Sequence, residues 1–301
     1  MGNFKDLDVL LEQFLNYYRT NGKSENTTKN YKVDLQLFMD YIVKHQLDLK
    51  SINTQELDGF KSYMVLEYSM ANGEHLKPSS INRMLIAMRQ YFKYLQYIGY
   101  RQDNPALLLN TMKTHKALPE YFKLEQVRKI LTSIEGENKE RDTAIFFVFL
   151  MTGMRLSELT GLKLENIRDD TLRIIHGKGD KERLVSLDDQ TLEILNTYLK
   201  IRGDSQSKSV FLTDRDSGIS TRAVQEMVKR RLIQAGVPVM SAHKLRHTAA
   251  TLMLQGGADI RVIQEALGHA NIKTTTIYAH VNETQKKKAA QDTQKLIGVT
   301  I

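Results

Sequence analysis

The chain has 301 residues, of which 41% are hydrophobic, and it contains no cysteine. This length suggests two domains with real hydrophobic cores, and the lack of cysteine excludes disulfides and cysteine-based metal sites, as in a reducing cytoplasm. The formal net charge of +8 favours a polyanionic partner. The N-terminus shows no signal-peptide pattern and no apolar run is long enough to span a bilayer. We therefore expect a soluble, cytoplasmic protein without a membrane segment.

Residues 1–113 are predicted to form a bundle of four or five helices. Apolar residues recur at helical spacing over residues 6–18, 27–44, 53–68 and 78–98. Asn53 with Glu56 three residues later is a helix-start signature, and Pro78 suits the first turn of a helix. Gly73 lies in a polar loop between the third and fourth of these segments.

The remaining two thirds of the chain mix helices with short strands. After a basic, proline-containing segment at 114–121, helical patterns cover residues 124–134 and 142–151, and the break after them places Arg155 at the start of another helix. Residues 162–167, 171–175 and 183–187 read as three short strands joined by tight turns. Further helices are predicted at 192–200, 220–235, 242–255 and 260–267. The fold class is mainly α, with a helical bundle followed by an α+β domain that holds a small antiparallel sheet.

The stretch 241–278 carries the side chains with the most chemistry. His243 and Arg246 are three residues apart, so they share a helical face and can both donate to one phosphate. Gly268 is a good helix C-terminal residue, which leaves His269 at a helix end, and Tyr278 follows. Any one of these residues alone is ordinary. Together, cations, imidazoles and a phenol suit the attack of a tyrosine on a phosphodiester.

This ordered set resembles the tyrosine recombinase, or phage integrase, family. The family pattern H-x-L-R-H-T matches residues 243–248, L-G-H matches 267–269, and Tyr278 follows nine residues after His269. Upstream, T-G-x-R-x-x-E matches residues 152–158, and G-K-G-x-K-x-R matches 177–183. The resemblance implies a SAM-like core-binding domain that clamps DNA at 1–113, a linker at 114–121, and a catalytic domain with a C-terminal docking tail at 122–301.

The resemblance implies six catalytic residues, and each side chain suits one part of the reaction. Tyr278 is the expected nucleophile. Two permanently charged, forked guanidinium groups suit the non-bridging phosphate oxygens, and these are Arg155 and Arg246. His243 either donates to the same phosphate or takes the tyrosine proton. The two remaining residues are His269, expected to hydrogen-bond the phosphate, and Lys178, expected to protonate the leaving 5′-oxygen.

Supporting roles fall on four further residues. Glu158, one turn beyond Arg155, is expected to orient a neighbouring basic group rather than to react. Arg83, Arg89 and Lys181 are the expected DNA contacts. The polar face of residues 78–98 and the basic cluster within 220–235 suit either DNA or solvent.

No metal and no cofactor is expected, because the side chains supply the positive charge. The expected partners are a double-stranded DNA site and three further copies of the chain, assembled as a tetramer on DNA by exchange of C-terminal tails. The pattern points to no particular accessory protein.

The leading hypothesis is a site-specific DNA recombinase, Xer-like or carried by a phage or transposon. It would cleave and rejoin strands through a 3′-phosphotyrosine intermediate. A type IB topoisomerase-like enzyme shares the nucleophile and cations, but the helical N-terminal domain argues against it. A non-catalytic, sequence-specific DNA-binding protein is the third possibility, and the complete catalytic set argues against that.

Overall fold

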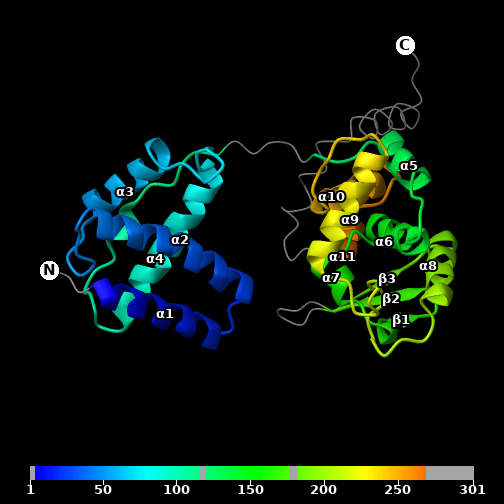
Figure 1. The fold of residues 1–301 in the computed structure, drawn as a ribbon, viewed down its shortest axis with the longest axis horizontal. Helices are drawn as coiled ribbons and strands as arrows, with labels where there is room; N and C mark the ends of the chain where they lie inside the picture. Colours follow the sequence, from blue (N-terminus) through cyan, green and yellow to red (C-terminus); the bar gives the residue numbers. More distant parts are fainter. Residues whose placement is uncertain (1–3, 115–119, 176–181, 269–301) are drawn as a thin grey trace, which may run out of the picture. The chain divides into compact units, whose positions relative to one another are not determined.

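The computed structural model describes residues 4–114, 120–175 and 182–268. The chain divides into two compact units, Met1–Lys116 and Ala117–Ile301, each with its own hydrophobic core. The helices and strands of each unit are labelled in Figure 1. No helix in these described ranges is both long and apolar enough to cross a bilayer.

The first unit consists of four α-helices and a short 3-10 helix over its described residues. They are α1 (Phe4–Thr20), α2 (Glu25–Lys44), α3 (Thr54–Leu66), α4 (Pro78–Tyr97) and η1 (Pro105–Leu108). The start of α3 is closed by a capping box, in which the Asn53 side chain accepts from the Glu56 amide and the Glu56 carboxylate accepts from the Asn53 amide. The apolar faces of these helices meet around a core with several aromatic rings, including Phe14, Phe38 and Phe92.

The second unit holds helices around a small sheet. Its helices are α5 (Leu124–Thr132), α6 (Lys139–Thr152), α7 (Leu156–Gly161), η2 (Leu164–Asn166), α8 (Asp189–Arg202), α9 (Thr221–Gln234), α10 (His243–Gln255) and α11 (Ile260–Leu267). The strands β1 (Ile167–Arg168), β2 (Thr171–Ile174) and β3 (Arg183–Ser186) form an antiparallel sheet in the order β1-β2-β3. The predicted fold class, mainly α with a three-stranded antiparallel sheet, is confirmed.

The first predicted strand, residues 162–167, is wrong over most of its length. Leu164–Asn166 is a 3-10 turn, and only Ile167–Arg168 pairs in the sheet. The alternating Leu162 and Leu164 pair instead with residues 208–210, since the Val210 amide donates to the Leu162 carbonyl at 2.9 Å and the Leu164 amide donates to the Lys208 carbonyl at 3.0 Å. The Asn166 side chain then accepts from the Lys163 amide at 2.9 Å and turns the chain.

The end of α6 lies against α10 and α11. Gly153 follows α6 with a left-handed backbone, φ 57°, and a Cβ built there would stand 2.5 Å from the Leu267 side chain and 3.5 Å from that of Ala249. Only glycine meets both conditions without strain. In Figure 1, α7, α10 and α11 lie on one side of the unit, next to α6.

Candidate active site

Three of the six predicted catalytic residues lie in the described part of the chain: Arg155, His243 and Arg246. The other three, Lys178, His269 and Tyr278, lie outside the described residues, as do the predicted DNA contact Lys181, most of the predicted linker and the C-terminal tail.

Arg246 is held in place by two backbone carbonyls. It lies on α10 with 3% of its surface exposed. Its Nη1 donates to the Gly153 carbonyl and its Nη2 donates to the Leu267 carbonyl, each at 2.8 Å. Because the two carbonyls bind two different nitrogens of a planar group, the bonds fix the orientation of the guanidinium.

Arg155 is held mainly by Glu158. It is the residue before α7, and its side chain is 40% exposed. Its Nη1 donates to Glu158 Oε1 at 2.8 Å, and its backbone amide donates to Glu158 Oε2 at 2.8 Å. Its Nη2 also donates to the Gly268 carbonyl at 3.3 Å. Arg155 therefore presents a half-exposed, oriented cation.

A third arginine, Arg183, completes this arrangement. It begins β3, and its side chain is 7% exposed. Its Nε donates to the Ala266 carbonyl at 2.7 Å, and its Nη2 donates to Glu158 Oε2 at 2.8 Å. The sequence contained Arg183 only as the last residue of the G-K-G-x-K-x-R match, without a role. That motif position was the one available signal for it.

The C-terminal end of α11 gathers the three guanidinium groups. The carbonyls of residues 266–268 accept in turn from Arg183, Arg246 and Arg155. The last carbonyls of a helix have no partner within the helix and form the negative end of its dipole. Side chains from β3, α10 and the start of α7 therefore converge on one helix end, which concentrates positive charge suited to a phosphate.

Glu158 is buried between two of these arginines. Burial alone would raise the pKa of its carboxyl, but the hydrogen bonds from Arg183 and Arg155 outweigh it and lower the pKa to about 2. The group therefore stays a carboxylate at neutral pH. Such a group orients cations and transfers no proton.

Two histidines lie at the start of α10. The rings of His243 and His247 are 4.7 Å apart with their planes at 82°. Partial burial, followed by the charges of Arg246, Lys244 and Arg155, lowers the pKa of His243. Burial, followed by interaction with His243, Lys244 and Arg246, lowers the pKa of His247 to about 4. His243 is therefore neutral at neutral pH, so it has one nitrogen that donates and one that accepts a proton.

Comparison with known proteins supplies the family. Residues 120–285 match the sequence model of the phage integrase family, and residues 11–97 match that of the phage integrase N-terminal SAM-like domain. The chain belongs to the phage integrase family. It is a tyrosine recombinase, an enzyme that cleaves and rejoins DNA strands. The family predicted from the motifs is thereby confirmed.

Relatives and solved structures agree with this placement. The recombinase is 37% identical to tyrosine recombinase XerC of Caldanaerobacter subterraneus subsp. tengcongensis, across 93% of this chain and 85% of that protein. XerH in a post-cleavage complex with the palindromic difH substrate has the same fold, with a TM-score of 0.75, 24% identity and 96% of each chain covered. A lambda integrase tetramer bound to a Holliday junction matches with a TM-score of 0.69 and 18% identity, over 88% of this chain and 77% of that one.

The two arginines predicted to contact DNA from the helical unit are both engaged within it. Arg89 donates to the carbonyls of Ala106 and Leu109, so it holds the segment after α4. Arg83 pairs with the buried Asp34, Nη1 to Oδ2 at 2.9 Å, and its side chain remains 41% exposed. Arg89 therefore stabilises the fold of the helical unit. DNA contact by either arginine stays a prediction.

Helix α9 divides its basic residues between two faces. Arg222, Lys229 and Arg230 are exposed, while Arg231 is buried. Since Arg222 and Lys229 lie about two turns apart, they share a face of the helix. The exposed part of the basic cluster is therefore a surface that this recombinase presents to solvent or to DNA.

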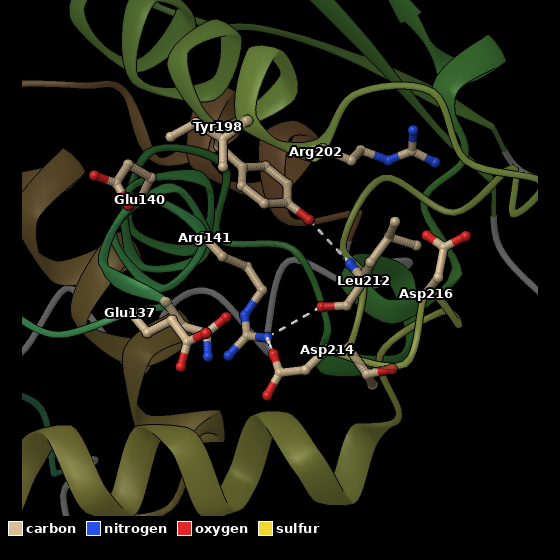
Figure 2. Close-up of a pocket in the computed structure, with 11 residues that line it drawn as sticks. Glu137, Glu140, Arg141, Tyr198, Arg202, Leu212, Asp214 and Asp216 are labelled. Atoms are coloured by element: carbon tan, nitrogen blue, oxygen red, sulfur yellow. Dashed lines mark hydrogen bonds and ion pairs between the residues drawn. The ribbon is translucent and has the colours of Figure 1, made fainter.

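A separate cavity of about 210 Å³ lies between the start of α6, the end of α8 and residues 212–216. Figure 2 shows Arg141 donating to the Leu212 carbonyl and to Asp214, and the Tyr198 hydroxyl accepting from the Leu212 amide at 3.0 Å. None of the three predicted catalytic residues within the described part of the chain, Arg155, His243 and Arg246, lines it. These contacts brace the loop after α8, away from the arginine cluster.

Proposed function

We propose that this recombinase is a site-specific strand transferase that works through a covalent bond between Tyr278 and a DNA 3′-phosphate. The observation that carries the proposal is the convergence of Arg155 and Arg246 on the end of α11. That end leads directly to His269 in the sequence, and Tyr278 follows. Two oriented guanidinium groups beside a predicted histidine and tyrosine suit attack on a phosphodiester.

The cleavage step forms one bond and breaks another. The Tyr278 oxygen attacks phosphorus, and the 5′-oxygen leaves as a hydroxyl after taking a proton from Lys178. Tyrosine has an ordinary pKa of about 10, so it needs a base, and the neutral His243 suits that task. Arg155, Arg246 and His269 hold the non-bridging oxygens while negative charge builds on them. In this scheme side chains supply all the positive charge and no metal ion takes part.

Rejoining is the same step in reverse with a different strand. The phosphotyrosine bond keeps the free energy of the broken phosphodiester, so a new 5′-hydroxyl can displace Tyr278 without ATP. We propose that four copies, linked by their C-terminal tails, carry this out on two duplex sites in the Xer manner. The XerC relative and the lambda integrase tetramer on a Holliday junction support this arrangement.

A nicked suicide duplex tests the nucleophile. The site would first be selected from random-sequence duplexes with the full-length protein, and a nick beside the scissile phosphate would then trap the covalent product. Wild type is expected to become attached to a 3′-phosphate, in the presence of a chelator as well. Tyr278→Phe is expected to bind the site without attaching.

The matched control is Tyr97→Phe, at a tyrosine that is 73% exposed in the helical unit. It should attach at the wild-type rate. Attachment by Tyr278→Phe would show that another residue is the nucleophile. Two intact sites giving exchanged products would distinguish a recombinase from a topoisomerase, which would only relax supercoils.

A further inference from the structure

We infer that Arg183 is a positioning residue for Arg155 and Arg246, the two arginines proposed to stabilise the transition state. It orients Arg155 through Glu158, and it fixes the position of the C-terminal end of α11, which Arg246 contacts. The inference rests on the proposed function, because Arg155 and Arg246, which Arg183 is inferred to position, are the residues proposed to hold the scissile phosphate. All the contacts that carry it lie within the described residues.

Arg183 is engaged by a carboxylate inside the protein. Its side chain is 7% exposed. Burying a cation is costly unless it is paired and hydrogen-bonded. Here the Glu158 carboxylate supplies the charge, and the Ala266 carbonyl accepts a second hydrogen bond. The guanidinium therefore acts inside the protein, on its neighbours.

Glu158 connects Arg183 to Arg155. Its Oε1 accepts from Arg155 Nη1, and its Oε2 accepts both from Arg183 Nη2 and from the Arg155 amide, all at 2.8 Å. Without Arg183, Glu158 Oε2 loses the charged donor Nη2. The buried Glu158 carboxylate can then rotate. The partly exposed guanidinium of Arg155, which donates to that carboxylate, would change its orientation as well.

The second bond of Arg183 acts on Arg246. The Ala266 carbonyl, held by Arg183 at 2.7 Å, precedes the Leu267 carbonyl, held by Arg246 at 2.8 Å. Arg183 holds the carbonyl and the carboxylate with two separate nitrogens, Nε and Nη2, whereas a lysine would have to bond both from a single nitrogen. Arg183 thus ties β3, α7 and α11 into one arrangement around the two catalytic cations.

The test measures single-turnover attachment to the suicide duplex at saturating protein. Arg183→Gln is expected to slow attachment by about 10–100-fold, the range seen when a group supporting a catalytic side chain is removed. Site affinity should stay close to wild type, whereas the thermal midpoint is expected to fall because the change breaks a buried ion pair. Arg183→Lys keeps the buried charge and is the variant to use if Arg183→Gln melts early; it should still be slow.

The matched control is Arg173→Gln. Arg173 belongs to the neighbouring strand β2 and also makes two bonds to a carboxylate, that of Glu182 at 2.7 and 2.9 Å, but both partners are exposed at the surface. Its removal should leave the attachment rate unchanged. Glu158→Gln should also slow attachment. In the Glu158→Gln background, Arg183→Gln should reduce the attachment rate by a smaller factor than it does in wild type, because the effects of coupled residues are not additive.

Two altered phosphates separate positioning from a merely structural effect. A methylphosphonate removes the charge of a non-bridging oxygen. It should reduce the rate penalty, meaning the fold by which Arg183→Gln slows attachment, because the arginines then stabilise less negative charge in the transition state. A bridging 5′-sulfur, which leaves without needing a proton, should leave the penalty in place. If the sulfur substrate removes the penalty, or if the penalty is the same on all three phosphates, the inference is wrong.

Failure of this inference is distinct from failure of the proposed function. If wild type attaches through Tyr278 and Arg183→Gln attaches equally fast, only the inferred role of Arg183 is wrong. If wild type forms no covalent product on its selected site, the proposed function itself is wrong.

Discussion

The orientation of Arg246 depends on Gly153, a residue without a side chain of its own. The Gly153 carbonyl accepts a hydrogen bond from Arg246 Nη1. Gly153 follows the last residue of α6 and has a left-handed backbone conformation, which ends the helix there. Its missing Cβ also leaves room for the Leu267 side chain, whose backbone carbonyl receives Arg246 Nη2. One glycine therefore affects both acceptors that orient the guanidinium of Arg246.

Replacing Gly153 with alanine should affect stability and rate together. The new methyl group would lie 2.5 Å from the Leu267 side chain at a φ of 57°. Such strain and overpacking typically cost about 1–3 kcal/mol. We expect Gly153→Ala to lower the free energy of unfolding in urea by that amount and to slow attachment to the suicide duplex.

Gly161→Ala is the control for this prediction. Gly161 ends α7, and a Cβ there meets nothing within 4 Å. That substitution should be neutral or stabilise by about 0.5–1 kcal/mol, as alanine does in a helix. Equal effects of the two substitutions would contradict the packing argument.

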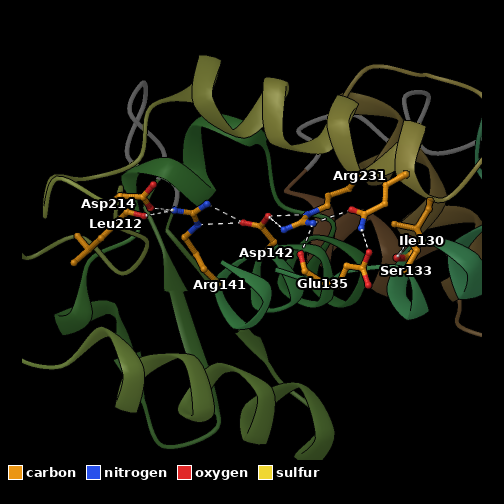
Figure 3. A network of polar contacts seen from close by, with 9 residues as sticks. Ile130, Ser133, Glu135, Arg141, Asp142, Leu212, Asp214 and Arg231 are labelled. Carbon is orange, nitrogen blue, oxygen red and sulfur yellow. Dashed lines mark hydrogen bonds and ion pairs between the residues drawn. The ribbon is translucent and has the colours of Figure 1, made fainter. Parts of the chain in front are cut away.

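At the scale of whole elements, a buried carboxylate fastens α6 to α9. Asp142, in the first turn of α6, is completely buried and accepts from Arg141 on one oxygen and from Arg231 of α9 on the other, at 2.6 to 3.1 Å. Arg231 reaches on to the Glu135 carbonyl at 2.7 Å, and Arg141 reaches Asp214 at 3.2 Å. Figure 3 shows this chain of contacts. It holds the basic helix α9 against the helix whose other end carries Gly153.

Asp142→Asn should destabilise the second unit strongly. The change removes the buried anion shared by two largely buried guanidinium groups, of which Arg141 keeps the exposed Asp214, and breaking a buried ion pair typically costs about 3–5 kcal/mol. We expect a matching fall in the free energy of unfolding measured in urea. The control is Asp214→Asn, because this carboxylate is 74% exposed and also pairs with Arg141. Its loss should cost at most about 1 kcal/mol, and a comparable loss at both positions would refute the account.

For the molecule as a whole, the net charge of +8 is the property most relevant to DNA. Each phosphate neutralised by a lysine or arginine releases counterions, so binding weakens as salt rises. The exposed face of α9 that carries Arg222 and Lys229 is a discrete part of that charge. Its contribution can be separated from that of the general surface.

Arg222→Gln combined with Lys229→Gln should flatten the salt dependence of DNA affinity. If both contact phosphates, the slope of log affinity against log salt should become less steep by about 1.8. Fluorescence anisotropy over a range of salt concentrations measures this. Lys200→Gln with Lys208→Gln removes two exposed charges from α8 and the loop after it. An equal change in slope for that pair would show that α9 acts only through net charge.

Local signals account for what could be predicted of the fold. Caps and apolar periodicity placed the helices close to their observed ends, and α11 covers Ile260–Leu267 as expected. The failed strand at 162–167 shows the limit, because Leu162 and Leu164 alternate as in a sheet but pair with residues 208–210. Alternation indicates an extended chain without naming its partner.

The sequence by itself determined the family and supplied the prediction of the reacting groups. Breaking a phosphodiester requires a nucleophile and fixed cations, and these residue types appear in a specific order and spacing. Only the tertiary structure decided how the cations are held. Arg155, Arg183 and Arg246 meet carbonyls 113, 83 and 21 residues away. Hydrogen bonds reach only about 3 Å, so contacts between such distant positions exist only once packing has brought the segments together.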